Sequence, residues 1–289
     1  TFTKCASLVL KTAQGYQGNP YLSYFDVLTA IAFQIFMTEK MEWVVLETGL
    51  GGLADSTNVT TKELCVLTKV GLDHQEVLGN SLQKIALEKI GITRPEIPVV
   101  VAEQVPELKP WLTEHLSESN VPCYFVDEIF DKYFPENKLS LELSSKPRLA
   151  CIQTSLCAMQ VLFNGNSSEK QKWLVSAQKV RIRGRLDLRQ NVFWRKHGKY
   201  FKTMLFDGGH NFDALTALLE FLTTNKLVPC TLILGMAADK LDPALRNPLK
   251  KLCEKAGNLI FTPMPSPRSA TPEALENFIS EYGNFEHSP

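Results

Sequence analysis

The sequence predicts an α/β protein built from two three-layer Rossmann-like domains. Short apolar runs alternate with helical stretches along the chain, which is typical of parallel α/β architecture. A basic, extended segment at residues 181–188 interrupts this alternation once. The length of 289 residues suits two domains. We therefore place a boundary near Asn191, with residues 1–190 as the first domain and residues 191–289 as the second.

The first domain is expected to contain buried strands separated by helices. Residues 43–48, 64–70 and 98–102 are short unbroken apolar runs, as expected for strands covered on both faces. Helices are predicted at residues 26–38, 81–91, 107–117 and 149–162.

The second domain is expected to open with a β-hairpin. Residues 192–196 and 200–206 would pair and turn at His197-Gly198, where the glycine suits the turn. A new series then follows, with strands predicted at residues 204–207, 231–235 and 259–262 and helices at residues 211–225, 243–256 and 272–282.

Composition excludes several classes of protein. Lysine plus arginine and aspartate plus glutamate both number 31, so the chain lacks the basic excess of a typical nucleic-acid binder. No apolar run approaches the roughly 18 residues of a membrane span. The 7 cysteines include no C-x-x-C pair, which predicts a reducing, cytoplasmic compartment and leaves a mitochondrial form open.

Polar residues follow three of the predicted strands. Glu47 ends an apolar run, Asp73-His74 follows the next, and Asp207 closes another before two glycines. Ligands of open α/β sheets bind beyond the carboxyl ends of the strands. Each carboxylate alone could instead cap the following helix. Three such strand ends in one chain favour a functional site.

The glycines at residues 49–54 match the dinucleotide pattern G-x-G-x-x-A after a predicted strand. That motif requires a helix to start at the turn, because the helix N-terminus holds the pyrophosphate. Residues 55–61 are polar and β-branched and form helices poorly. We interpret the segment as a shaped loop and disfavour a dinucleotide site.

Lys89 shares the apolar face of its predicted helix. It follows Leu82, Ile85 and Ala86 at helical spacing. The lysine could simply extend its ammonium group to the surface. Alternatively its amine points into a site near His74, where a neutral amine can react with carbon dioxide to form a carbamate.

Several motifs together resemble the folylpolyglutamate synthase/dihydrofolate synthase family of the Mur ligase superfamily. They occur in order over nearly the whole chain. The principal matches are ETGLGGLADSTN at residues 47–58, LDH at 72–74, EKIGI at 88–92 and DGGHN at 207–211, supported by SYFD at 23–26, Gly184-Arg185 and Gly235-Met236 with Asp239-Lys240.

The resemblance implies an ATP-dependent ligase that adds L-glutamate to a folate or dihydropteroate carboxylate. ATP would convert the carboxylate to an acyl phosphate, which the glutamate amine then attacks. Mg²⁺ would neutralise the anions that must meet. By this resemblance, Glu47, His74 and a carbamylated Lys89 would hold magnesium, Arg185, Asp207 and Gln153 would contact ATP, and Lys89 and His210 would be catalytic.

The resemblance also implies where a pterin-linked substrate binds. Tyr24 and Phe25 would offer ring faces to the pterin, and the same ligand would contact Ser23, Asp26, Ala54, Asp55 and Ser56. The expected partners are small molecules, with no nucleic acid and no membrane, and we expect a monomer. The segment at residues 23–26 favours a bifunctional enzyme over a folylpolyglutamate synthase alone.

The chain departs from the family pattern in three respects. The family's phosphate-binding P-loop would precede residue 1, and the C-terminal end of its second domain would follow Pro289. The family's GGRLDATN reads GGLADSTN, so Leu53 replaces an arginine. Two interpretations follow: a large part of an active ligase, or a non-catalytic relative that keeps the fold. We expect the 289-residue chain alone to show little ligation.

Overall fold

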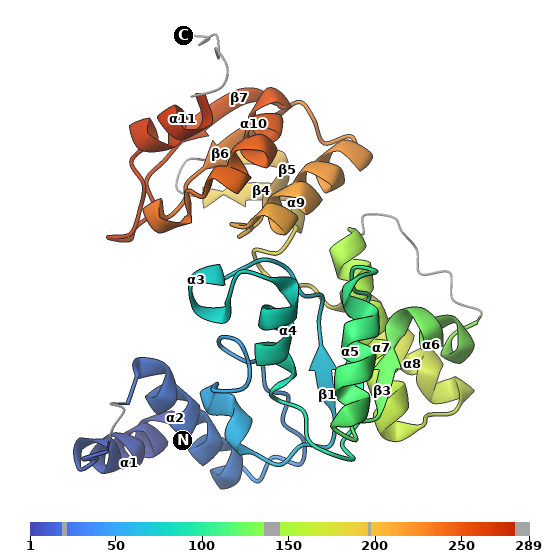
Figure 1. The fold of residues 1–289 in the computed structure, drawn as a ribbon. Helices are drawn as coiled ribbons and strands as arrows, with labels where there is room; N and C mark the ends of the chain where they lie inside the picture. Colours follow the sequence, from blue (N-terminus) through green and yellow to red (C-terminus); the bar gives the residue numbers. More distant parts are fainter. Residues whose placement is uncertain (19–21, 136–144, 196–197, 281–289) are drawn as a thin grey trace. The chain divides into compact units, whose positions relative to one another are not determined.

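A computed structural model describes residues 1–18, 22–135, 145–195 and 198–280 (Figure 1). Its contacts divide the chain into two compact units. The first comprises Thr1–Tyr133 and Cys157–Asn164, and the second comprises Phe134–Leu156 and Gly165–Pro289. Both units combine strands with helices, which confirms the predicted α/β class.

The first unit contains a three-stranded parallel sheet of order β1-β2-β3. Its strands are β1 (Cys65–Leu67), β2 (Val99–Val101) and β3 (Cys123–Phe125), and Val99 aligns with both Cys65 and Cys123. The helices of this part of the chain are α1 (Phe2–Gln14), α2 (Tyr24–Thr38), α3 (Gln75–Leu78), α4 (Leu82–Ile90), α5 (Leu108–Glu118) and α6 (Val126–Tyr133), with a 3-10 turn η1 (Ser56–Val59).

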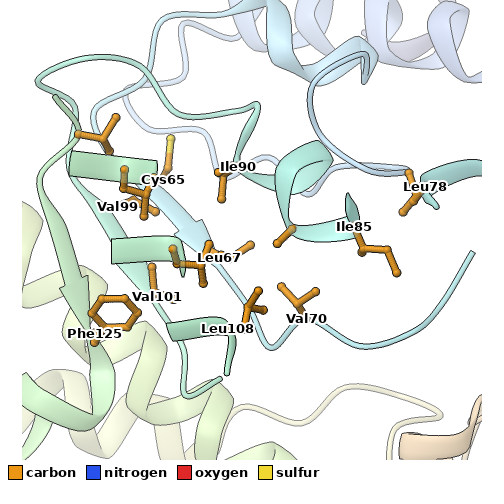
Figure 2. Close-up of a cluster of buried hydrophobic side chains, with 14 residues drawn as sticks. Cys65, Leu67, Val70, Leu78, Ile85, Ile90, Val99, Val101, Leu108 and Phe125 are labelled. Atoms are coloured by element: carbon orange, nitrogen blue, oxygen red, sulfur yellow. The ribbon is translucent and has the colours of Figure 1, made fainter. Parts of the chain in front are cut away.

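The core of the first unit lies between the sheet and helices α4 and α5. Val99 and Leu67 from the strands, Ile85 from α4 and Leu108 from α5 belong to one cluster of buried side chains (Figure 2). Ile85 and all three residues of β2 are fully buried. The unbroken apolar sequence of β2 therefore reflects burial on both faces.

Local signals explain where the predicted helices begin. The Ser23 side chain accepts a hydrogen bond from the Asp26 amide, and the Asp26 carboxylate accepts one from the Ser23 amide. Ser81 caps α4 by accepting from the Lys84 amide. These caps satisfy amide groups that have no partner within the helix. The helices predicted at residues 26–38, 81–91 and 107–117 are confirmed, as are the strands within residues 64–70 and 98–102.

The strand predicted at residues 43–48 is wrong. These residues have no regular structure and pair with none of the described strands. Val45 is 99% exposed, and the Trp43 ring packs edge-on against that of Phe163, with the ring centroids 5.0 Å apart. An apolar run becomes a strand only where a neighbour completes the hydrogen-bond ladder.

The second unit contains an antiparallel hairpin and a parallel strand pair. The hairpin joins β4 (Asp187–Trp194) to β5 (Lys199–Phe206), which confirms its prediction, although His197 at the expected turn lies outside the described residues. The expected strand at 204–207 is the end of β5 rather than a separate element. β6 (Cys230–Leu234) pairs in parallel with β7 (Ala256–Phe261).

Helices α9 (Phe212–Thr224), α10 (Arg246–Glu254) and α11 (Pro272–Ser280) pack around a core that includes Leu215, Leu249 and Leu275. They confirm the helices predicted in this region. Helix α7 (Lys146–Phe163) contributes residues to both units, and helix α8 (Ser167–Lys179) follows it. The second unit also contains the 3-10 turns η3 (Ala238–Lys240) and η4 (Pro243–Leu245). Helices α1, α3, α6 and α8 and strand β3 were not predicted. No helix in the described ranges is long and apolar enough to cross a membrane.

Candidate active site

The glycine segment at residues 49–58 is a loop organised by the Asp55 carboxylate. One Asp55 oxygen accepts from the Gly49 amide at 2.8 Å and the Leu50 amide at 2.9 Å. The other accepts from the Thr57 amide at 2.9 Å and the Thr57 hydroxyl at 2.6 Å. Burial alone would raise the pKa of Asp55, but the hydrogen bonds from Thr57, Leu50 and Gly49 outweigh it and hold that pKa below its usual value. No dinucleotide-type helix follows the glycines.

This loop packs against the C-terminal end of α4. The Leu53 amide donates to the Glu88 carbonyl oxygen at 2.8 Å. A Cβ atom added to Gly52 would lie 2.7 Å from the Lys89 carbonyl oxygen and 2.8 Å from that of Glu88. Only glycine permits this approach of two backbones. The loop is therefore attached directly beside Lys89.

The N-terminus of α2 contacts the other side of the loop. The Ser56 hydroxyl donates a short hydrogen bond to the Asp26 carboxylate. This bond, followed by those from Ser23, lowers the pKa of Asp26. The Phe25 ring lies on the Gly49 backbone, since a Cβ atom there would be 2.6 Å from the ring. The structure thus brings together the two segments that the sequence assigned to one substrate.

The side chains in this cluster differ in how much of their polar or aromatic surface remains available to a ligand. Asp26 and Asp55 already accept hydrogen bonds from the protein, so they hold the loop in shape. Phe25 is 40% exposed against the loop, whereas Tyr24 is 81% exposed. The Ala54 side chain is also exposed. Tyr24 therefore offers the largest free aromatic surface to a ligand.

The three residues expected to hold magnesium lie on separate segments of the first unit. His74 has a left-handed backbone, with φ of 53°, and its two ring nitrogens each lie 3.9 Å from a carboxylate oxygen, of Asp73 and of Glu76. Lys89 is half-buried in the last turn of α4, and Glu47 is exposed. In the described ranges, no three histidine, cysteine, aspartate or glutamate residues gather as a metal site. The convergence of Glu47, His74 and Lys89 on one metal ion stays a prediction.

In the second unit, Asp207 joins two loops. Its carboxylate accepts from the Leu186 amide and from the Gly209 amide, both at 2.8 Å. The Gly208 amide donates to the Gly184 carbonyl oxygen, also at 2.8 Å. Arg185, which lies between Gly184 and Leu186, is exposed beside this junction.

His210 and Gln153 complete the set of predicted nucleotide and catalytic residues. His210 is exposed, and its Nδ1 atom lies 3.0 Å from the Gly208 carbonyl oxygen. Asn211 then caps α9 by accepting from the Ala214 amide at 3.0 Å. Gln153 is half-buried on α7 and makes no side-chain hydrogen bond within the described part of the chain.

Sequence reasoning did not single out Lys109. Its ammonium group lies 2.6 Å from Asp127 and 2.8 Å from Glu128, over the ring of Phe125. Burial would lower the pKa of Lys109, but the two carboxylates raise it overall. Lys109 and Asp127 line an open depression with Gln104, at the carboxyl ends of β2 and β3. Since both carboxylates neutralise Lys109, the depression offers no free cation to an anionic ligand.

Comparisons with known proteins identify relatives over most of the chain. A folylpolyglutamate synthase of Lacticaseibacillus casei is 28% identical over 284 residues, covering 92% of this chain. A dihydrofolate synthase/folylpolyglutamate synthase of Haemophilus influenzae is 33% identical over 222 residues, covering 71% of this chain. The chain belongs to the folylpolyglutamate synthase/dihydrofolate synthase family.

The chain spans less than two thirds of these relatives, 64% of the Lacticaseibacillus casei protein and 50% of the Haemophilus influenzae protein. No protein-family profile matches it.

Solved structures of this family share the fold. A Mycobacterium tuberculosis folylpolyglutamate synthase complexed with ADP and AMPPCP has a TM-score of 0.79 at 23% identity, over 97% of this chain and 66% of that one. A bifunctional folylpolyglutamate synthase/dihydrofolate synthase with Mn, AMPPNP and L-glutamate bound has a TM-score of 0.71 at 22% identity, over 97% of this chain and 67% of that one.

The structure also shows what the Leu53 departure does. The Leu53 side chain is 58% exposed, and its Cβ atom packs close to Gly91 at the end of α4. An apolar side chain thus stands at the surface of the loop where the family pattern has an arginine. The hydrogen bond from the Leu53 amide to the Glu88 carbonyl oxygen is a backbone contact, so the departure leaves it in place.

Proposed function

We propose that this chain forms much of an ATP-dependent ligase that adds L-glutamate to a folate or dihydropteroate carboxylate through an acyl phosphate. The observation that best supports this proposal is the position of the glycine loop. Two segments typical of the family hold the loop in place: Asp26 of α2 contacts one side, and Glu88, the neighbour of Lys89, contacts the other. A ligand lying on this loop would contact the candidate substrate residues close to the backbone of the candidate catalytic lysine.

Two of the three donors would be the carboxylate oxygens that Mg²⁺ prefers. Glu47 and a carbamylated Lys89 would supply carboxylate oxygens, and His74 would supply an imidazole nitrogen. Neither Glu47 nor Lys89 forms an ion pair with another described residue, so both remain available. Bound magnesium would neutralise the phosphate and carboxylate charges that repel one another.

Residues of the second unit would bind ATP and assist phosphoryl transfer. Asp207 orders the turn beside Arg185, whose forked guanidinium suits phosphate oxygens. Gln153 would contribute an amide contact to ATP. His210 would hold the transferring groups in position from the same turn, because positioning dominates catalysis of this reaction.

The substrate would lie on the exposed ring of Tyr24, with Phe25 beside it. Ser23, Asp26, Ala54, Asp55 and Ser56 would complete the surface, and the two aspartates act mainly by fixing the loop. Both folylpolyglutamate and dihydrofolate synthesis fit this arrangement. We also propose a cytoplasmic, monomeric protein whose domains divide near residue 190.

The experiment measures phosphate release from ATP by the natural full-length protein with Mg²⁺, L-glutamate and either dihydropteroate or tetrahydrofolate. Glutamate-dependent release is expected, and the preferred pterin substrate separates the two activities. Lys89→Ala should lose most of the rate, and bicarbonate should not restore it, because no amine remains to carbamylate. A folded protein that releases no phosphate with either substrate would favour the non-catalytic alternative.

A further inference from the structure

The C-terminal end of α8 carries two guanidinium groups that share the same pair of acceptors. Nη2 of Arg148 donates to the carbonyl oxygens of Gln178 at 2.9 Å and Val180 at 3.2 Å. Nη1 of Arg181 donates to the same two oxygens at 2.6 Å and 2.9 Å. Arg148 comes from α7 and is half-buried, whereas Arg181 is exposed. Two cations therefore meet on one small patch.

Further cations follow this pair along the chain. Lys179, Arg183 and Arg185 lie on the same segment. The first carboxylate after them, Asp187, already pairs with Arg189 at 2.6 Å. Within the described ranges, neither arginine of the pair has a carboxylate partner. Because the whole chain has a net charge of zero, this stretch concentrates positive charge locally.

Capping of α8 explains one of the two arginines but not both. A single guanidinium can satisfy the exposed carbonyl oxygens at a helix end. The second guanidinium brings a like charge close to the first. Burial, together with the charge of Arg181, lowers the pKa of Arg148. Each guanidinium has five N–H donors and uses only one terminal nitrogen here. The remaining donors make no other hydrogen bond among the described residues, and an oxyanion bound to them would offset the repulsion.

We propose that Arg148 and Arg181 form a binding site for carboxylates of an extended acidic ligand, a γ-linked chain of glutamates. The oxyanion chemistry follows from the paired guanidinium forks, which match carboxylate geometry. The choice of a glutamate chain rests on the proposed function, because repeated glutamate addition produces a substrate with one more carboxylate each time. The cations Lys179, Arg181 and Arg183, at alternate positions along the segment, suit several carboxylates in a row.

The test titrates tetra-γ-L-glutamate, without a pterin, into the protein and measures affinity by calorimetry at low ionic strength. Arg181→Gln should weaken binding about tenfold, as expected for loss of one charged hydrogen-bonding partner. Arg181→Lys should bind with intermediate affinity, because it keeps the charge and loses the fork. Lys172→Gln is the matched control, since Lys172 is an exposed cation on α8. This variant should bind tetraglutamate like the unmodified protein.

Equal affinities for Arg181→Gln and Lys172→Gln would overturn the proposal. Inorganic phosphate is titrated in parallel, and binding of phosphate without tetraglutamate would overturn the assignment to a carboxylate chain. Arg148→Gln should reproduce the loss, with circular dichroism to confirm that α7 and α8 remain folded. If ligation fails while tetraglutamate binding depends on Arg181, this inference stands and the proposed function does not.

Discussion

The Asp207 carboxylate accepts a 2.8 Å hydrogen bond from the Leu186 amide, 21 residues earlier in the chain. Its other oxygen accepts from the Gly209 amide at 2.8 Å. One side chain therefore fixes the loop that carries Arg185 against the turn that carries His210. The positions of Arg185 and His210, which we propose to act on the nucleotide, therefore depend on this carboxylate.

Replacing Asp207 with asparagine should destabilise the second unit by about 1–3 kcal/mol, because the new NH₂ group would face a backbone donor that loses its acceptor. Urea unfolding measures the change. Asp213→Asn removes the same charge from the exposed first turn of α9 and should cost clearly less. Similar losses in both variants would show that charge, rather than the two hydrogen bonds, matters at Asp207.

Gly52→Ala should destabilise the first unit by more than about 1 kcal/mol, because the added Cβ would collide with the backbone oxygens of Glu88 and Lys89. Gly15→Ala is the control, since its Cβ would meet one oxygen at an ordinary 3.6 Å. That change should be neutral or slightly stabilising. Thermal unfolding of both variants checks this, and an unchanged Gly52→Ala midpoint would contradict the close approach of loop and α4.

Asp26 and Ser56 should be coupled energetically. We expect a double-mutant cycle with Asp26→Asn and Ser56→Ala to give an interaction free energy of about 1 kcal/mol, because their side chains share one hydrogen bond. Denaturant unfolding of the four proteins provides the value. Strictly additive effects would mean that this bond does not join α2 to the loop.

The Asp55 hydrogen bonds should make stability depend on pH in one direction. The pKa of Asp55 is lowered in the folded protein, so its contribution is complete above the unfolded pKa of about 3.9 and is lost as the pH falls through the folded pKa. The difference in unfolding free energy between the unmodified protein and Asp55→Asn should therefore be large at pH 7 and shrink below about pH 4. A difference that stays constant from neutral to acidic pH would refute this role.

The glycine loop shows how much of the candidate site the sequence predicts. The polar residues after Ala54 indicate a loop and disfavour a dinucleotide-type helix, and the structure agrees. The resemblance also grouped residues 23–26 with residues 54–56. It did not show that the Asp26 and Asp55 carboxylates are occupied by protein donors, because that depends on the final position of each amide and hydroxyl.

The sequence by itself determined the elements whose signals are local. Ser81 and Gly91 mark the ends of α4, and Asn211 marks the start of α9, because capping hydrogen bonds join residues only a few positions apart. Tertiary structure decided the rest. An apolar run at residues 43–48 stays irregular because a strand needs a neighbour to complete its hydrogen bonds. Likewise Leu53 meets Glu88 only because distant segments pack together, and no pattern within either segment specifies that contact.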